Sequence, residues 1–151
     1  MTFEDWVRPH LGAMARLSAR LAPHADRDDV VQEALARAWL KRHQYDAARG
    51  TPAAWLLAIT ADQARKAARR FRGTTAEVPD DGVAAEWDAR VDVRRAMRQL
   101  TDRQRLAIDC YYFAGLSTAE TAAVMDCSVG TVKSTLADAR LRLRTLLAVT
   151  G

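Results

Sequence analysis

The segment 115–147 places the strongest constraint on the fold, because it carries the signals of two helices separated by a short turn. Ser117 stands three residues before Glu120, which is the spacing of a capping box at the start of a helix. A turn is predicted at Asp126, and Ser128 is predicted to cap a second, longer helix. Two helices joined in this way are typical of a helix-turn-helix.

The two faces of this helix pair differ in chemistry. The positions predicted to point inward are apolar, and several are small enough for the helices to cross closely: Ala122, Ala123, Val129, Val132, Leu136 and Leu143. The positions predicted to point outward at the start of the second helix are short and polar or cationic: Ser128, Thr131, Lys133, Ser134 and Thr135. Such groups reach base edges and phosphates, so the segment predicts DNA binding, with an ordinary helical hairpin as the alternative.

The rest of the chain also predicts helices. Alanine, leucine and arginine dominate, and no stretch alternates apolar and polar residues as a strand does. Pro9 interrupts the first apolar stripe, where we expect a kink or a late helix start. Asp26 and Thr51 are predicted to cap the second and third helices, and Pro52 suits the first position of the third. The predicted helices cover residues 3–21, about 26–42, 52–72, 87–100 and 102–114.

Charge and turn-forming residues divide the chain into parts. Residues 1–72 carry a net charge of +5, residues 73–92 of −5 and residues 93–151 of +4, within a total of +4. Glycine, threonine, proline and aspartate are concentrated in residues 73–86, which predicts a flexible linker. The predicted fold is therefore all-α, with two small helical domains at 1–72 and 87–151 joined by an acidic linker.

Several classes of function are not indicated. Cys110 and Cys127 have no paired ligand spacing, so we predict neither a metal site nor a disulfide scaffold. The sequence contains no phosphate-cradling loop, no nucleophile–base spacing and no pair of catalytic carboxylates, so we expect neither an enzyme nor a cofactor. We expect no signal peptide and no membrane insertion, and therefore a cytoplasmic protein with reduced thiols.

Motifs at both ends of the chain resemble one family. Residues 115–117 (GLS) and 127–134 (CSVGTVKS) resemble the promoter-binding domain of the ECF (extracytoplasmic function) sigma factors, and residues 100–105 (LTDRQR) resemble its entry helix. Residues 28–39 (DDVVQEALARAW) resemble the helix with which this family docks on RNA polymerase, and residues 54–59 (AWLLAI) resemble the start of its −10-facing helix. Two separate motifs in the family's order are more specific than either one alone.

The resemblance implies a protein that binds core RNA polymerase and directs it to promoter DNA with −10 and −35 elements. The implied −35 contacts are Ser128, Thr131, Lys133, Ser134, Thr135 and Arg140. The implied contacts for the −10 element and strand opening are Tyr45, Asp46, Arg49, Asp62, Arg65, Lys66, Arg69 and Arg70. The implied polymerase surface is Asp28, Asp29, Gln32, Glu33 and Arg37. An anti-sigma factor is a common partner in this family, and the acidic linker would lie near the RNA exit path.

Three departures from the family pattern bear on DNA affinity. Asp62 stands where the family has an asparagine near the −10 bases, and a carboxylate accepts hydrogen bonds but donates none. Thr135, Ala137 and Asp138 stand where cations are usual, and each lost cation removes a phosphate contact with its counterion release. Asp126 replaces a common glycine in the turn, although aspartate tolerates left-handed geometry moderately well.

The roles of the aromatic residues and of the whole chain have alternatives. Trp39 and Trp55 lie on apolar stripes and are predicted to pack in the core, whereas Tyr45 either stacks on an unpaired base or packs within its loop. Two other functions compete with that of a sigma factor. The chain could be a stand-alone helix-turn-helix regulator that binds palindromic sites, or a degenerate sigma-like protein that sequesters a partner.

Overall fold

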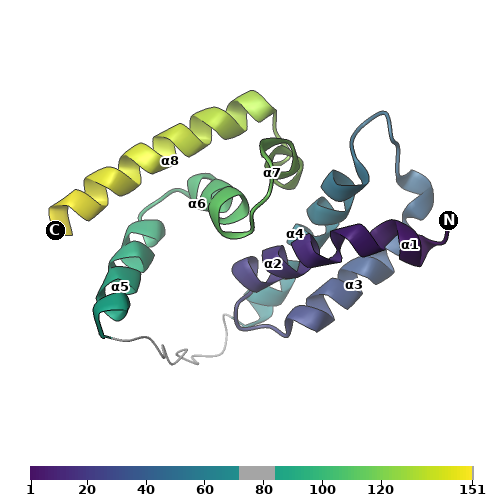
Figure 1. Cartoon of the computed structure of the whole chain (residues 1–151), viewed down its shortest axis with the longest axis horizontal. Helices are drawn as coiled ribbons and strands as arrows, with labels where there is room; N and C mark the ends of the chain where they lie inside the picture. The colour runs from purple at the N-terminus through teal and green to yellow at the C-terminus, as the bar shows by residue number, and fades with distance from the viewer. Residues whose placement is uncertain (72–83, 151) are drawn as a thin grey trace.

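The computed structural model of the chain describes residues 1–71 and 84–150, with side chains in 1–71 and 91–148. All regular elements of these residues are helical, which confirms the predicted all-α fold (Figure 1). Helices α1–α4 form an N-terminal lobe and α5–α8 form a C-terminal lobe beside it. The elements are α1 (Phe3–Val7), η1 (Arg8–His10), α2 (Leu11–Leu21), α3 (Arg27–Leu40), η2 (Arg42–Gln44), α4 (Pro52–Phe71), α5 (Ala84–Arg98), α6 (Asp102–Ile108), η3 (Asp109–Phe113), α7 (Thr118–Met125) and α8 (Val129–Thr150).

The N-terminal lobe is built around α4. Helices α2 and α3 both pack against it, and fully buried side chains of Met14, Leu17, Leu56 and Leu57 fill the space between them. The 3₁₀ turn η1 separates α1 from α2 at Pro9, whose ring removes a backbone donor, so the predicted interruption is confirmed.

Side-chain caps fix the starts of α3 and α4. The Asp26 carboxylate accepts hydrogen bonds from the backbone N–H of Asp28 at 2.9 Å and of Asp29 at 3.4 Å. The Thr51 hydroxyl accepts from the backbone N–H of Ala54 at 3.1 Å. Each cap satisfies a donor that has no partner within its helix, and both predicted helix starts are confirmed.

The C-terminal lobe differs from the prediction in one helix. The predicted helix at 102–114 is α-helical only as far as Ile108, and the π-helical turn η3 follows it. In this turn the backbone N–H of Ala114 donates to the carbonyl of Asp109, five residues earlier, at 2.9 Å. The wider turn rotates the aromatic residues 111–113 relative to α6. Gly115 then ends the helix with a φ of 71°, a conformation that glycine adopts without steric strain.

Two predicted boundaries also move. Most of the predicted linker, residues 73–86, lies outside the described residues, but residues 84–86 already belong to α5. At the other end, α8 continues beyond the predicted end at Leu147, as far as Thr150. Helix α8 packs on α5, α6 and α7, and the core between them contains Met97, Leu100, Ala107, Ile108, Ala122, Met125, Val132, Leu136 and Ala139.

The two lobes pack directly against each other. Helix α7 contacts α4, and η3 contacts α2. Four buried residues of the C-terminal lobe belong to the same apolar cluster as the N-terminal core: Cys110, Ala114, Leu116 and Val124. The hydrophobic pattern of the sequence did not predict this contact, because periodicity shows that a face is apolar but does not show which element packs on it.

Candidate nucleic-acid interface

The helix-turn-helix has the local geometry that its residues predict. The Ser117 hydroxyl accepts from the Glu120 N–H at 3.0 Å, and the Glu120 carboxylate accepts from the Ser117 N–H at 2.8 Å, which completes the capping box. Asp126 adopts a left-handed conformation with φ 54°, and its turn leads directly into α8. Ser128 caps α8 by accepting from the backbone N–H of Thr131 at 3.1 Å.

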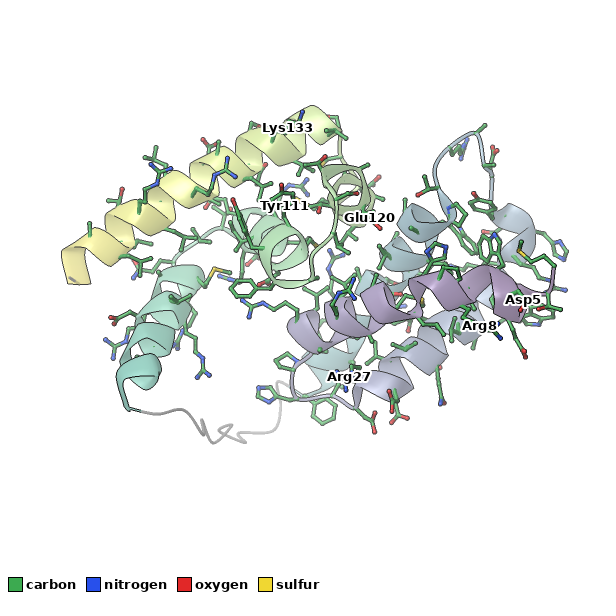
Figure 2. The ribbon with its side chains drawn as sticks, viewed as in Figure 1. Asp5, Arg8, Arg27, Tyr111, Glu120 and Lys133 are labelled. Carbon is green, nitrogen blue, oxygen red and sulfur yellow. The ribbon has the colours of Figure 1, made fainter. Side chains whose placement is uncertain are left out.

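The predicted −35 residues share one exposed stretch of α8. Ser128, Thr131, Lys133 and Ser134 are exposed, and Figure 2 shows Lys133 on the outer side of the helix. Thr135 is half-buried. The hydroxyls of Ser128 and Thr131 share a hydrogen bond of 2.9 Å, and the Ser134 hydroxyl donates to the Thr131 carbonyl at 3.0 Å. This stretch therefore presents a cation among short hydroxyl side chains.

Two residues of α8 differ from a simple inward–outward pattern. Val129 was predicted to point inward but is 37% exposed, because it is the first residue of α8 and α7 does not cover it. Arg140, a predicted −35 residue, lies further along the helix, where its guanidinium donates to the Tyr112 hydroxyl at 2.8 Å. Arg140 is thus placed against η3 and apart from the residues near the start of α8.

The predicted −10 residues of α4 lie on its second half, beyond the buried Leu57. Asp62, the residue that departs from the family pattern, forms an ion pair with Lys66 at 3.3 Å. Arg69 and Arg70 are exposed, whereas Arg65 is half-buried beside the C-terminal lobe. Asp62 therefore neutralises one of the four cations that the sequence places on this helix.

The loop between α3 and α4 is held by its own contacts. The Tyr45 ring packs against Trp6 and Trp55, with ring centroids 5.3 and 5.6 Å apart, and its hydroxyl donates to the Gly50 carbonyl at 3.2 Å. The structure shows the Tyr45 ring packed against α1 and α4, and its stacking on an unpaired base stays a prediction. The Asp46 carboxylate accepts from the Ala48 N–H at 2.9 Å, so the loop that contains Arg49 is braced at both ends.

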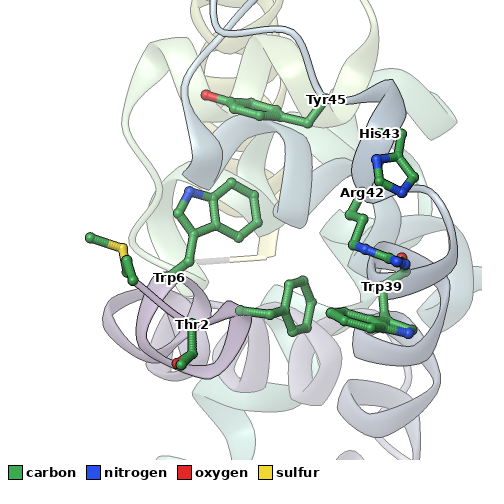
Figure 3. A pocket seen from close by; sticks show the side chains of 8 residues that line it. Thr2, Trp6, Trp39, Arg42, His43 and Tyr45 are labelled. Carbon is green, nitrogen blue, oxygen red and sulfur yellow. The ribbon is translucent and has the colours of Figure 1, made fainter.

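An aromatic pocket opens beside this loop. Its volume is about 380 Å³, and Figure 3 shows Trp6 and Tyr45 on one side of it and Trp39 with Arg42 on the other. Trp39 was predicted to be a core residue but is 47% exposed, because it lies near the end of α3, with Phe3 against the edge of its ring. The Arg42 guanidinium lies 3.8 Å from the centre of the Trp39 ring.

Sequence reasoning missed part of this pocket. Phe3 was predicted only to begin an apolar stripe, and no role was predicted for Trp6. Both residues line the pocket, and the Trp6 ring packs against Tyr45. Their spacing of three residues places both rings on one face of α1, and this spacing was the available signal.

The predicted polymerase surface lies on the outer face of α3. All five of its residues are exposed, and Glu33 pairs with Arg37 at 3.2 Å: Asp28, Asp29, Gln32, Glu33 and Arg37. The buried face of the same helix carries Val30, Ala34 and Ala38. The helix thus separates a packing face from a charged face that is open to a partner.

Neither cysteine lies in a metal site. Cys110 is buried, and its burial together with the nearby carboxylate of Asp109 raises its pKa to about 12. Cys127 is half-buried in the turn of the helix-turn-helix. Among the described residues, no cluster of histidine, cysteine and acidic side chains is suited to hold a metal, and no helix has the length and apolarity needed to cross a membrane.

Comparison with known families assigns both lobes. Residues 6–75 match the family model of Sigma-70 region 2, and residues 90–143 match that of Sigma-70, region 4. Among solved structures, the chain is similar to CnrH in complex with the cytosolic domain of CnrY, with a TM-score of 0.68 and 29% identity over 99% of this chain and 89% of that one. It is also similar to the sigma factor RpoE in complex with the anti-sigma factor NepR from Bartonella quintana, with a TM-score of 0.63 and 28% identity over 97% of both chains.

Similar proteins of known name agree with these matches. The ECF RNA polymerase sigma factor SigK of Mycobacterium ulcerans (strain Agy99) is 31% identical over 133 residues, which cover 80% of this chain and 71% of SigK. The ECF RNA polymerase sigma factor SigM of Mycobacterium tuberculosis (strain ATCC 35801 / TMC 107 / Erdman) is 34% identical over 155 residues, which cover 96% of this chain and 76% of SigM. The helix-turn-helix lobe, the second lobe with its charged α3 face and these matches lead to one conclusion: the chain belongs to the ECF RNA polymerase sigma factors.

Proposed function

We propose that this sigma factor uses three exposed surfaces, one to bind core RNA polymerase and two to bind promoter DNA. The charged face of α3 binds core RNA polymerase, α4 with the loop at 45–51 engages the −10 element, and α8 reads the −35 element. The observation that carries this proposal is the presence of both sigma regions in one chain, each with most of its predicted contact residues exposed. Sigma factors are transcription factors, and the proposed work requires binding energy without catalysis.

The proposed −35 contact uses the start of α8. The side chains of Lys133 and Ser134 are exposed there, and the helix N-terminus carries a partial positive charge that favours a phosphate. A lysine contributes one phosphate contact, and the short hydroxyl side chains allow close approach to base edges. The −35 site would therefore rely on close fit, because Thr135, Ala137 and Asp138 leave Lys133 as the one cation among residues 128–139.

The proposed −10 contact combines α4 with the loop before it. Arg69 and Arg70, which are exposed, would supply charge for the phosphates, and the loop braced by Asp46 would hold Asp46 and Arg49 beside an opened strand. An unpaired base that leaves the duplex loses stacking, and an aromatic or polar pocket recovers part of that energy. Since Asp62 already neutralises Lys66, we expect fewer phosphate contacts here than four cations would provide.

Reconstituted transcription tests the proposal. The purified chain is mixed with core RNA polymerase from its source cell, and run-off transcripts are measured from a library of fragments of that genome. We expect transcripts that core enzyme alone does not make. The absence of such transcripts, together with no co-elution of the chain with core enzyme, would refute the proposed function.

A pair of variants locates the polymerase surface. Asp29→Arg reverses an exposed charge on α3 and should weaken co-elution with core enzyme. Glu4→Arg reverses an exposed charge on α1, outside the proposed surface, and should leave co-elution unchanged. Equal effects of the two variants would contradict the assignment of α3 to polymerase binding.

A protein inhibitor is a second proposed partner. The two similar structures contain sigma factors bound to other proteins, CnrY in one and the anti-sigma factor NepR in the other. We therefore propose that an anti-sigma factor controls this chain in the cytoplasm, where polymerase and DNA are found. A pull-down from the source cell tests this, because it should recover polymerase subunits and a small inhibitor.

The same experiments separate the two competing functions. A stand-alone regulator would protect an operator from cleavage without polymerase, and the charged face of α3 would then have no partner. A protein that only sequesters a partner would give no run-off transcript and would show little dependence of DNA binding on salt. A sigma factor with several phosphate contacts shows a steep dependence.

A further inference from the structure

One side of α8 points away from the rest of the C-terminal lobe, at whose edge this long helix lies (Figure 1). Val132, Leu136 and Ala139 are buried, and their spacing of three to four residues marks the packed side of the helix. The exposed residues on the opposite side are Gly130, Ser134, Ala137, Asp138 and Leu141. Spacings of three and four residues connect these five along the helix, so they form one outer row.

The outer row begins with short side chains. Gly130, Ser134 and Ala137 have side chains no longer than that of serine, and Lys133 flanks them as the one cation among residues 128–139. The major groove of DNA is wide enough to admit an α-helix. Because little side-chain volume would separate the backbone of α8 from the base edges, even a short side chain of this row can reach a base.

Gly130 supports a close approach, because nothing within the chain requires a glycine at this position. A Cβ atom built on Gly130 would have the Ser128 hydroxyl oxygen as its nearest neighbour at 3.8 Å, which is an ordinary van der Waals contact. Glycine is also less favourable than alanine within a helix. A glycine that weakens its helix and has room for a side chain fits a surface that a partner approaches closely.

Asp138 is the acidic residue of the outer row, and no cation among the described residues lies within 4 Å of its carboxylate. Asp62 and Asp109, by contrast, each pair with a cation. Arg140, two residues after Asp138, donates to the Tyr112 hydroxyl instead. A carboxylate without a partner is repelled by the phosphates of DNA. On a helix that binds DNA, Asp138 therefore lowers affinity unless a group on the DNA donates a hydrogen bond to it.

The base edges in the major groove decide which base can supply this donor. Cytosine presents an amino donor there, whereas adenine presents its amino group beside the N7 acceptor. Guanine presents the N7 and O6 acceptors, and thymine presents the O4 acceptor. An ionised carboxylate accepts hydrogen bonds and donates none. Cytosine is therefore the base that suits Asp138, because each of the other bases would place a lone pair against the carboxylate.

We propose that Asp138 is a specificity-determining residue of this sigma factor, and that it reads a cytosine of the −35 element by accepting a hydrogen bond from the amino group of that base. The inference rests on the proposed function, because it takes α8 to lie in the major groove of the −35 element. Asp138 lies about 6 Å beyond Ser134 along the helix axis, at a rise of about 1.5 Å per residue. The cytosine is thus about two base pairs from the bases beside Ser134, at about 3.4 Å per base pair.

A promoter library tests the proposal with the chain bound to core RNA polymerase. In one promoter that the chain transcribes in the run-off experiment, the base pairs of the −35 element are randomised, and a barcode in each transcript identifies the active members. We expect the parent chain to favour cytosine about tenfold on one strand at one position. Asp138→Asn should move the preference at that position alone to adenine, because an amide accepts from adenine N6 and donates to N7.

Asp126→Asn is the matched control. Asp126 is also an exposed carboxylate of the helix-turn-helix, but it lies in the turn before α8 and is not part of the outer row. Asparagine tolerates the left-handed backbone of this turn, so the variant removes the same charge and keeps the fold. It should leave every base preference unchanged. The same change of preference in both variants would overturn the proposal.

The library also separates this inference from the proposed function. Transcripts that show no preference for cytosine, or a preference that Asp138→Asn leaves in place, would overturn the reading by Asp138 and leave the sigma function established. The absence of transcripts from every member would refute the sigma function, and this inference with it.

Gly130→Ala tests the close approach on which the short Asp138 side chain depends. The added methyl group stands on the outer row, so transcription from the parent promoter should fall several-fold. The urea midpoint of unfolding should not fall, because alanine favours a helix more than glycine does. Unchanged transcription would show that DNA does not come close to Gly130 and would overturn the proposal.

Discussion

The contact between Arg20 and Asp109 gives a quantitative test of how strongly the lobes are held together. Arg20→Met keeps most of the aliphatic length of the side chain and removes its charge. In the intact pair the Asp109 side chain is 12% exposed and the Arg20 side chain is 34% exposed. The substitution therefore leaves a largely buried carboxylate without its direct partner. It also removes the guanidinium from the Phe113 ring.

The structure sets the size of the expected effect. A hydrogen bond to a charged group contributes about 1.5–3 kcal/mol, and the lower part of this range applies because water reaches one third of the Arg20 side chain. The cation–π contact adds about 0.5 kcal/mol for a partly exposed pair. We therefore expect Arg20→Met to lower the free energy of unfolding by about 2 kcal/mol at neutral pH.

The effect of pH follows from the ionisation of Asp109. Burial raises the pKa of this carboxyl above its ordinary value of 3.8, and the charge of Arg20 opposes the rise. A raised pKa in the folded state means that the stability linked to protonated Asp109 is present at acid pH and is lost as the pH rises through that pKa. Without Arg20 the pKa rises further, so the variant loses more stability than the parent over this range.

Urea unfolding at two pH values measures both quantities. Below pH 3.8, the ordinary pKa of this carboxyl, Asp109 is more than half protonated in the parent and in the variant, so the difference falls toward the loss of about 0.5–1 kcal/mol from the aromatic contact and packing. At neutral pH the full difference of about 2 kcal/mol returns. Asp109→Asn serves as the control, because Arg20→Met in its background should no longer depend on pH. An identical loss at both pH values would refute the assigned coupling.

Three further predictions concern the fold and the DNA-reading helix. Ser117→Ala removes the acceptor for the Glu120 N–H and should lower the free energy of unfolding by about 1 kcal/mol in chemical denaturation. Leu57→Ala empties a fully buried position and should lower it by about 2–5 kcal/mol in the same assay. Lys133→Ala should lower promoter activity and reduce the slope of log affinity against log salt by about 1, with unfolding changed by less than about 0.5 kcal/mol. Unchanged transcription would remove Lys133 from the −35 site.

Local sequence signals predicted where helices start and are interrupted, because each such signal acts on residues close to it in the chain. The capping residues Asp26, Ser117 and Ser128 each satisfy a backbone donor two or three positions away, so their effect is independent of the rest of the fold. Pro9 acts equally locally by removing a donor. The exposed positions on α8 followed in the same way from helical spacing, except that Val129, predicted to point inward, is exposed and Thr135, predicted to point outward, is half-buried.

Features that depend on distant contacts were not predictable in this way. The π-turn η3 has no local sequence signal, and it aligns the aromatic Phe113 with Arg20, which lies on another lobe. Trp39 lies on an apolar stripe, yet its exposure is set by its place near the end of α3 and by its contact with Phe3. These outcomes are properties of packing between elements, and helical periodicity only reports that a face is apolar.

The contact between lobes shows most clearly why periodicity was insufficient. Leu116 and Val124 lie in the C-terminal lobe, but both belong to the apolar cluster of the N-terminal core. The buried carboxylate of Asp109 gives the physical reason for specificity, because a charged group in such a place is stable only with a partner at one position. Apolar residues would permit several docked arrangements of the lobes, whereas the pairing of Asp109 with Arg20 favours one.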